Sequence, residues 1–192
     1  MENKGWAPSD REWLLPKVRG HMPESVKVID LRVGSAHIEV DTVMEVGGAE
    51  DIRRYVERFL PVIDLREVSK SEETRKPEVV VMTAVQLFNS ERFWEAHEVL
   101  EGLWRRLTGV EKSVVHGLIL LAAAYVHLQR AELEVFRSIL ARAKTVLEEH
   151  EVVEMFGLDL DALRRLLDRA VNSTDIVKLN IVDNRNHVLE TR

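Results

Sequence analysis

The pattern of hydrophobic and polar residues changes its period along the chain. From residue 26 to residue 42 apolar and polar positions alternate with a period of two, which is typical of half-buried β-strands. A helical stripe over residues 49–60 and an extended run over residues 62–68 follow. A short helical turn is also expected from Ser9, with Pro16 limiting its length. The first part of the chain therefore predicts a small ββαβ unit.

The turn between the first two strands is expected at Gly34-Ser35, because glycine in the first position favours a two-residue hairpin turn. This turn would place Val33 opposite Ala36 and Leu31 opposite Ile38, with all four side chains on one face. The other face would then be a solvated surface on which opposite charges pair between strands. Its members are Asp30, Arg32, His37, Glu39, Asp64 and Arg66.

After a polar stretch from Ser69 to Lys76, the apolar positions follow a helical period. Several helices with short connections predict an antiparallel bundle, and the most apolar helix is expected at its centre. The expected helices cover residues 77–88, 90–107, 111–130, 132–149 and a last segment that Asp159 caps. The fold class is therefore α+β, with a small N-terminal ββαβ unit followed by an antiparallel helical bundle of about five helices.

The composition shifts divide the chain into three regions. Residues 1–75 would hold the ββαβ unit with an N-terminal extension, residues 76–171 the helical bundle, and residues 172–192 a polar tail. Within this tail, residues 176–182 have an extended pattern. Two interpretations remain open, namely an additional strand for the N-terminal sheet or a loose tail.

The helix expected over residues 90–107 carries the most unusual set of side chains. Its spacings of three or four residues place one group of side chains on the same side of the helix. The group consists of Trp94, His97, Glu98, Glu101, Trp104 and Arg105. Because tryptophans mark both ends of this side, we expect it to face the inside of the bundle. Burying unpaired charges is costly, so the imidazole and the carboxylates should either satisfy one another or form a site.

A metal site is one interpretation of this group. His97 and Glu101 are four residues apart on the helix and could reach one metal ion. His116 and His127 would lie about 16 Å apart along the apolar helix, so only one of them could join the same ion. A ligand set of His97, Glu101 and His127 would suit a divalent transition metal. Glu98 would then be the catalytic general base of a metal-dependent hydrolase.

A structural interpretation explains the same residues without a ligand. Glu98 or Glu101 can pair with Arg105 or Arg106, and His97 can bond to a backbone carbonyl group. Tryptophans at such positions are more often core residues than ligand-stacking residues. A pocket for a small ligand is the third interpretation.

Several motifs in this region resemble the pattern of the "domain of unknown function 309" family over about residues 80–150. They are Phe88-Asn89, Phe93-Trp94-Glu95-Ala96-His97-Glu98, Glu101 with Trp104, and Gly117-Leu118-Ile119 with Ala122-Ala123. The resemblance implies a small all-helical bundle with no established activity. It also implies that the family's signature falls on Asn89, Glu95, His97, Glu98, Glu101, Trp104 and His127. His116 departs from the pattern, which has glutamine there in many members, and the ββαβ unit lies outside the resemblance.

Two functions therefore remain open. In the first, the chain is a binding or scaffold domain with a polar pocket for a small ligand or a protein partner. The pocket residues would be Asn89, Trp94, Glu95, His97, Glu98, Glu101, Trp104 and His127. In the second, the chain is the metal-dependent hydrolase described above.

Composition narrows the classes of partner. A formal net charge of -6 argues against a broad nucleic-acid surface or an anionic-membrane surface. The absence of cysteine excludes disulfides and Cys-type zinc sites. No uninterrupted apolar run has the length of a membrane span, and the N-terminus lacks the apolar core of a signal peptide. We therefore expect a cytoplasmic protein, and a homo-oligomer is compatible with the sequence.

Overall fold

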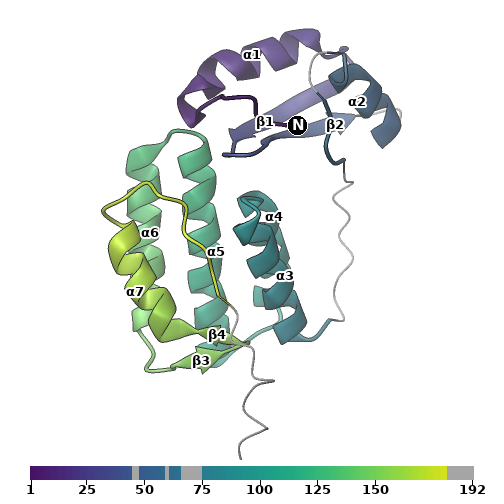
Figure 1. The fold of residues 1–192 in the computed structure, drawn as a ribbon. Coiled ribbons are helices and arrows are strands. Elements are labelled where there is room, and N and C mark those ends of the chain that lie inside the picture. Colours follow the sequence, from purple (N-terminus) through teal and green to yellow (C-terminus); the bar gives the residue numbers. More distant parts are fainter. Residues whose placement is uncertain (45–47, 59–60, 66–74, 181–192) are drawn as a thin grey trace, which may run out of the picture. The chain divides into compact units, whose positions relative to one another are not determined.

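The fold is that of a computed structural model, which describes residues 1–44, 48–58, 61–65 and 75–180. It is an α+β fold, as predicted, and divides into two compact units (Figure 1). The N-terminal unit comprises Met1–Ser71 with Leu128–Glu132, and the helical unit comprises Glu72–His127 with Leu133–Arg192.

The N-terminal unit consists of a helix-covered hairpin followed by a short helix. A 3-10 turn (Pro8–Asp10) leads into α1 (Arg11–His21), and β1 (Val26–Val33) pairs with β2 (Ile38–Met44) before α2 (Ala49–Val56). One stripe of α1 packs on the apolar face of the hairpin, and this core contains Leu14, Val18, Val28, Leu31, Val33 and Ile38. The prediction that Pro16 would limit the first helix is wrong, because α1 continues through it.

The register of the hairpin differs from the prediction by two residues. Val33 lies opposite Ile38 and Leu31 opposite Val40, so the connection spans residues 34–37 instead of two residues. The backbone groups of Gly34 explain the longer loop. Its N–H donates to the His37 carbonyl (2.9 Å) and its carbonyl accepts from the Asn3 side chain (2.7 Å). The bond between Gly34 and His37 continues the ladder beyond the Val33–Ile38 pair, so the chain reverses after Gly34 and the turn is not centred on Gly34-Ser35.

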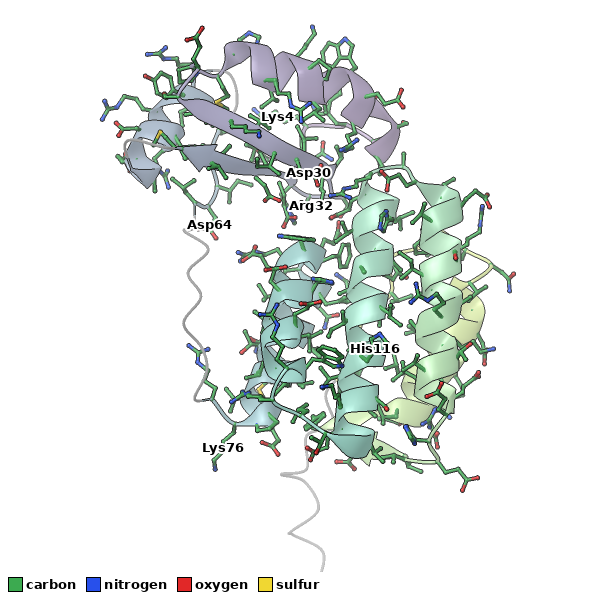
Figure 2. The ribbon with its side chains drawn as sticks, turned by 180° about the vertical axis from the view of Figure 1, so that it is seen from behind. Lys4, Asp30, Arg32, Asp64, Lys76 and His116 are labelled. Carbon is green, nitrogen blue, oxygen red and sulfur yellow. The ribbon has the colours of Figure 1, made fainter. Side chains whose placement is uncertain are left out.

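Part of the charged face of the hairpin is buried, which corrects the prediction of a solvated surface, whereas the predicted pairing of opposite charges between the strands is confirmed. Asp64 is exposed as predicted, and Arg66 lies outside the described residues. Asp30 and Arg32 are 6% and 2% exposed, and Figure 2 shows their side chains next to each other. The Arg32 guanidinium lies 3.0 Å from Asp30, 2.9 Å from Glu39 and 2.8 Å from Asp41. A register irregularity between Val28 and Asp30 reverses the side-chain alternation and leaves Ile29 47% exposed. Burial of the arginine is thus compensated by three carboxylates.

The third strand of the expected ββαβ unit is not seen where the structure describes the chain. Residues 61–65 form no strand, and residues 66–68 lie outside the described residues. The short helix α2 also ends at Val56, before the predicted limit, and residues 59–60 are not described.

The helical unit contains the five helices that the periodicity predicted. They are α3 (Pro77–Asn89), α4 (Phe93–Trp104), α5 (Gly109–Gln129), α6 (Leu133–Glu148) and α7 (Leu160–Ala170). Asp159 caps α7 as expected, since its carboxylate accepts a hydrogen bond from the Ala162 N–H (2.7 Å). A two-stranded hairpin of β3 (Glu154–Met155) and β4 (Leu158–Asp159) precedes α7 and was not predicted.

Helix α5 is the core of the helical unit. By length and composition alone it meets the criteria for a membrane-crossing helix, with a mean hydropathy of 1.4 over 18 residues. However, 56% of this window is buried inside the fold, and core helices of soluble proteins meet the same criteria. Its buried Tyr125 ring lies 5.0 to 5.4 Å from the rings of Phe88, Phe93 and Phe136. These contacts join α3, α4 and α6 to α5.

Candidate functional site

Helix α4 turns a different face to the core from the one that the two tryptophans indicated. Its buried residues are Phe93, Ala96, Leu100 and Leu103, which also repeat at spacings of three and four. The predicted inward face is only partly covered, and the Glu98 side chain is 46% exposed. The prediction that a histidine and two carboxylates point into the bundle is therefore wrong. The competing stripe is entirely apolar, so its burial costs no desolvation of charge.

Trp94, His97 and Glu98 do come together. The indole and imidazole rings stack with centroids 5.3 Å apart and an interplanar angle of 8°. Nδ1 of His97 lies 3.6 Å from a Glu98 carboxylate oxygen, which is too long for a hydrogen bond. That nitrogen is buried and has no hydrogen-bond partner among the described residues. The group can contact a ligand, but it supplies one imidazole only.

The other predicted residues of α4 form separate pairs. Glu101 accepts a hydrogen bond from Arg105 (3.1 Å), as the structural interpretation anticipated, and Glu95 accepts two from Arg92 (both 2.6 Å). The ring of Trp104 lies 6.2 Å from that of His116, which is labelled on α5 in Figure 2. These pairs lie at partly exposed positions and hold neighbouring side chains in place.

The structure does not assemble the predicted metal ligands. Within the described ranges no group of three or more His, Asp or Glu side chains is placed to hold a metal ion. His97 stacks on Trp94, Glu101 pairs with Arg105, and His127 is half-buried on α5. The described residues therefore give a metal centre no geometric support.

Asn89 is the predicted site residue with the most specific contacts. It is the last residue of α3, and its side-chain amide binds both backbone groups of Leu179. Nδ2 donates to the Leu179 carbonyl (2.7 Å), and Oδ1 accepts from the Leu179 N–H (2.8 Å). We call residues 175–180 the strap. One asparagine thus holds an extended segment that lies 90 residues further along the chain.

An apolar hollow receives the Leu179 side chain. Helices α3, α4 and α5 line it with Val81, Ala84, Val85, Phe88, Leu100 and Leu118. Leu179 is 8% exposed, and the cavity left beside it is about 10 Å³, at the lower limit of the space that holds one water molecule. The neighbouring Lys178 ammonium donates to the backbone carbonyl of Asn89. The strap is therefore bound through its backbone, one apolar side chain and one cation.

Tyr125 holds the beginning of the strap. Its hydroxyl donates to the Asp175 carbonyl (3.1 Å), and Figure 1 shows the strap running along α5. Burial raises the pKa of Tyr125 to about 12, so the phenol stays protonated and remains a donor at neutral pH. The strap is thereby fixed at both ends, by α5 and by the end of α3.

Sequence reasoning placed residues 176–182 either in the N-terminal sheet or in a loose tail. Residues 176–180 instead lie on the helical unit, and residues 181–192 are outside the described part. The site residues Tyr125, Lys178 and Leu179 were not predicted. The one usable signal was a short apolar run with Leu179 inside a polar tail. A strand-like pattern does not indicate which partner completes its hydrogen bonds.

Comparisons with known proteins cover the same region of the chain. A family model described as a domain of unknown function (DUF309) matches residues 81–139, which include Asn89, α4 and α5. Among solved structures, the chain is similar to a conserved hypothetical protein from Thermus thermophilus. The two are 34% identical over 48% of this chain and 95% of that chain, with a TM-score of 0.41. A comparison with curated proteins gives no match.

Proposed function

Because this chain belongs to the DUF309 family, as its motifs predicted, we propose a function from the contacts inside the family region. The helical unit is a non-catalytic binding domain that holds an extended peptide segment in the hollow beside Asn89. The strap occupies that hollow as an intramolecular ligand. The two hydrogen bonds between the Asn89 amide and the Leu179 backbone carry the proposal.

These two hydrogen bonds are made to backbone groups and do not depend on the side chain of the bound residue. They satisfy the N–H and the carbonyl of one residue, as a neighbouring strand does when a peptide is added to a sheet edge. Every peptide except one with proline at this position offers the same two groups. The hollow adds apolar burial, worth roughly 1.5–3 kcal/mol for a leucine side chain. Backbone bonds supply register and the hollow supplies most of the affinity.

The chemistry of the site favours binding over catalysis. The groups facing the strap are an amide, apolar side chains and a tyrosine whose pKa is raised to about 12. A phenol with that pKa stays protonated near neutral pH and does not act as a general base. For the hydrolase alternative, the residues expected as metal ligands do not come together in the described part of the fold. We therefore place peptide binding first.

The test uses the full chain with Leu179→Asp, which places a carboxylate in the apolar hollow and should release the strap. A labelled synthetic peptide of residues 173–180 is then titrated into this variant, and its fluorescence anisotropy is measured. We expect saturable binding with a Kd on the order of 10–100 μM, as two hydrogen bonds and one buried leucine allow. Circular dichroism checks that the variant keeps its helices.

Two matched proteins control this experiment. The wild-type chain should bind the peptide about 10–100-fold more weakly, because its own strap competes at an effective concentration on the order of 1 mM. Adding Asn89→Ala to the Leu179→Asp variant should remove binding, since both backbone hydrogen bonds are lost. If the folded Leu179→Asp variant fails to bind the peptide at millimolar concentration, the proposed function is wrong.

A further inference from the structure

The contacts of the strap also define which peptide segments the hollow can accept. We infer that the site selects an extended segment of a partner protein in which a basic residue directly precedes a leucine. This inference rests on the proposed function and specifies its ligand. Within the chain, Lys178 and Leu179 are the basic residue and the leucine, so the strap is a competitor with the same pattern.

Selection for leucine follows from the size of the hollow. Leu179 leaves about 10 Å³ unfilled among the lining side chains, and these are buried themselves. A larger side chain such as phenylalanine would have to displace well-packed residues, which is costly in a closely packed interior. Alanine would leave most of the hollow empty and lose the apolar burial. The hollow therefore discriminates against side chains that are larger than leucine and against side chains that are smaller.

Selection for a preceding cation follows from the end of α3. The last carbonyl groups of a helix have no partner within the helix and carry a partial negative charge. Asn89 is the last residue of α3, and its carbonyl accepts a hydrogen bond from the Lys178 ammonium. An acidic side chain in this position would face that carbonyl without a donor. Arginine could replace lysine, since it also donates from a long side chain.

The register of the bound segment connects the preference for leucine with the preference for a basic residue. The Asn89 amide binds the N–H and the carbonyl of the same residue that fills the hollow, so the leucine position is fixed. The basic residue must then come directly before it to reach the Asn89 carbonyl. Four residues before the leucine, the Tyr125 hydroxyl donates to the Asp175 backbone carbonyl, a contact that any residue in this position can make. A reversed Leu-Lys order would fail to satisfy both positions.

The experiment compares labelled peptides on the full-length Leu179→Asp variant. The reference peptide has the sequence of residues 173–180, and its variants carry Leu179→Ala, Leu179→Phe, Lys178→Glu, Lys178→Arg or the reversed Leu-Lys order. We expect binding at least tenfold weaker for both leucine variants and for the reversed order. Lys178→Glu should weaken it about fivefold, and Lys178→Arg should leave it within about twofold.

The outcomes separate this inference from the proposed function. If the reference peptide fails to bind, the proposed function itself is wrong. If the reference peptide binds and the alanine, phenylalanine and glutamate variants bind equally well, the selectivity is wrong while the binding function stands. A wild-type chain that dimerises with rising concentration, and stays monomeric as Leu179→Asp, would also overturn the assignment to a partner protein. In that case a second copy would deliver the strap.

Discussion

Gly117 of α5 provides the sharpest test of the packing in the helical unit. A Cβ atom at this position would lie 2.5 Å from Cγ and 2.7 Å from Cδ2 of Leu147 on α6. Leu147 is 1% exposed, so its side chain has little space to move away. The Gly-Leu-Ile motif therefore begins with glycine because the two helices approach closely there. We predict that Gly117→Ala destabilises the helical unit.

Two opposing effects set the magnitude. Alanine in a helix interior is favoured over glycine by about 1 kcal/mol. Overpacking a filled core costs about 1–3 kcal/mol. The matched control is Gly102→Ala in α4, where the added Cβ meets nothing within 4 Å and the position is exposed. This control should gain up to about 1 kcal/mol, so the difference between the two variants isolates the overpacking of about 1–3 kcal/mol.

The assay is urea unfolding followed by circular dichroism at the helix band. Leu147→Ala should cost about 2–5 kcal/mol alone. In combination with Gly117→Ala the two changes should compensate each other by about 1 kcal/mol or more, because the new methyl group enters the space left by leucine. A Gly117→Ala chain as stable as the Gly102→Ala chain, with additive effects in the double variant, would refute the close approach.

The pKa of Tyr125 is about 12 in the fold and about 10 in an unfolded chain, so its contribution to stability is full below about pH 10 and is lost as the pH rises towards 12. Urea unfolding of Tyr125→Phe should therefore depend less on pH in this window, and equal slopes would contradict the burial argument. Arg32→Ala leaves three carboxylates without their shared cation, so it should lower the free energy of unfolding of the N-terminal unit by about 3–5 kcal/mol, measured by tryptophan fluorescence. The control is Arg54→Ala, whose side chain is 72% exposed and which should lower it by less than about 0.5 kcal/mol. Metal analysis of protein purified without a histidine tag should find less than about a tenth of an equivalent of any transition metal, and a full equivalent that His97→Ala removes would revive the hydrolase.

Helix α4 shows where reasoning from the sequence reached its limit. Two faces of this helix satisfy the helical spacing, one marked by tryptophans and the other by Phe93, Ala96, Leu100 and Leu103. Large aromatic residues usually lie inside a protein, which favours the first face. The structure buries the second, because an all-apolar face avoids the desolvation of His97, Glu98 and Glu101. Tryptophan can remain half-exposed, whereas a carboxylate without a partner rarely remains buried.

The hairpin shows a second limit, which concerns register. Alternation predicted both strands, but a bulge between Val28 and Asp30 and a loop of four residues changed the pairs. Such features depend on contacts from distant residues, in this case the Asn3 side chain on the Gly34 carbonyl. A local pattern with a period of two residues does not reveal such contacts. Because of this change in pairing, Arg32 is buried, although the alternation of its sequence neighbours predicted a solvated face.

Local spacing and motifs were sufficient to predict the α+β class, the five helices of the helical unit, the Asp159 cap and the family. The buried face of α4, the pairing of the hairpin and the position of the strap could not be predicted from local patterns. Each of these depends on which distant surface satisfies a backbone group or an apolar side chain. The pairing of Asn89 with Leu179, 90 residues apart, is the clearest case. Hydrogen bonds between residues so far apart in the sequence depend on the complete tertiary fold, since no local periodicity predicts them.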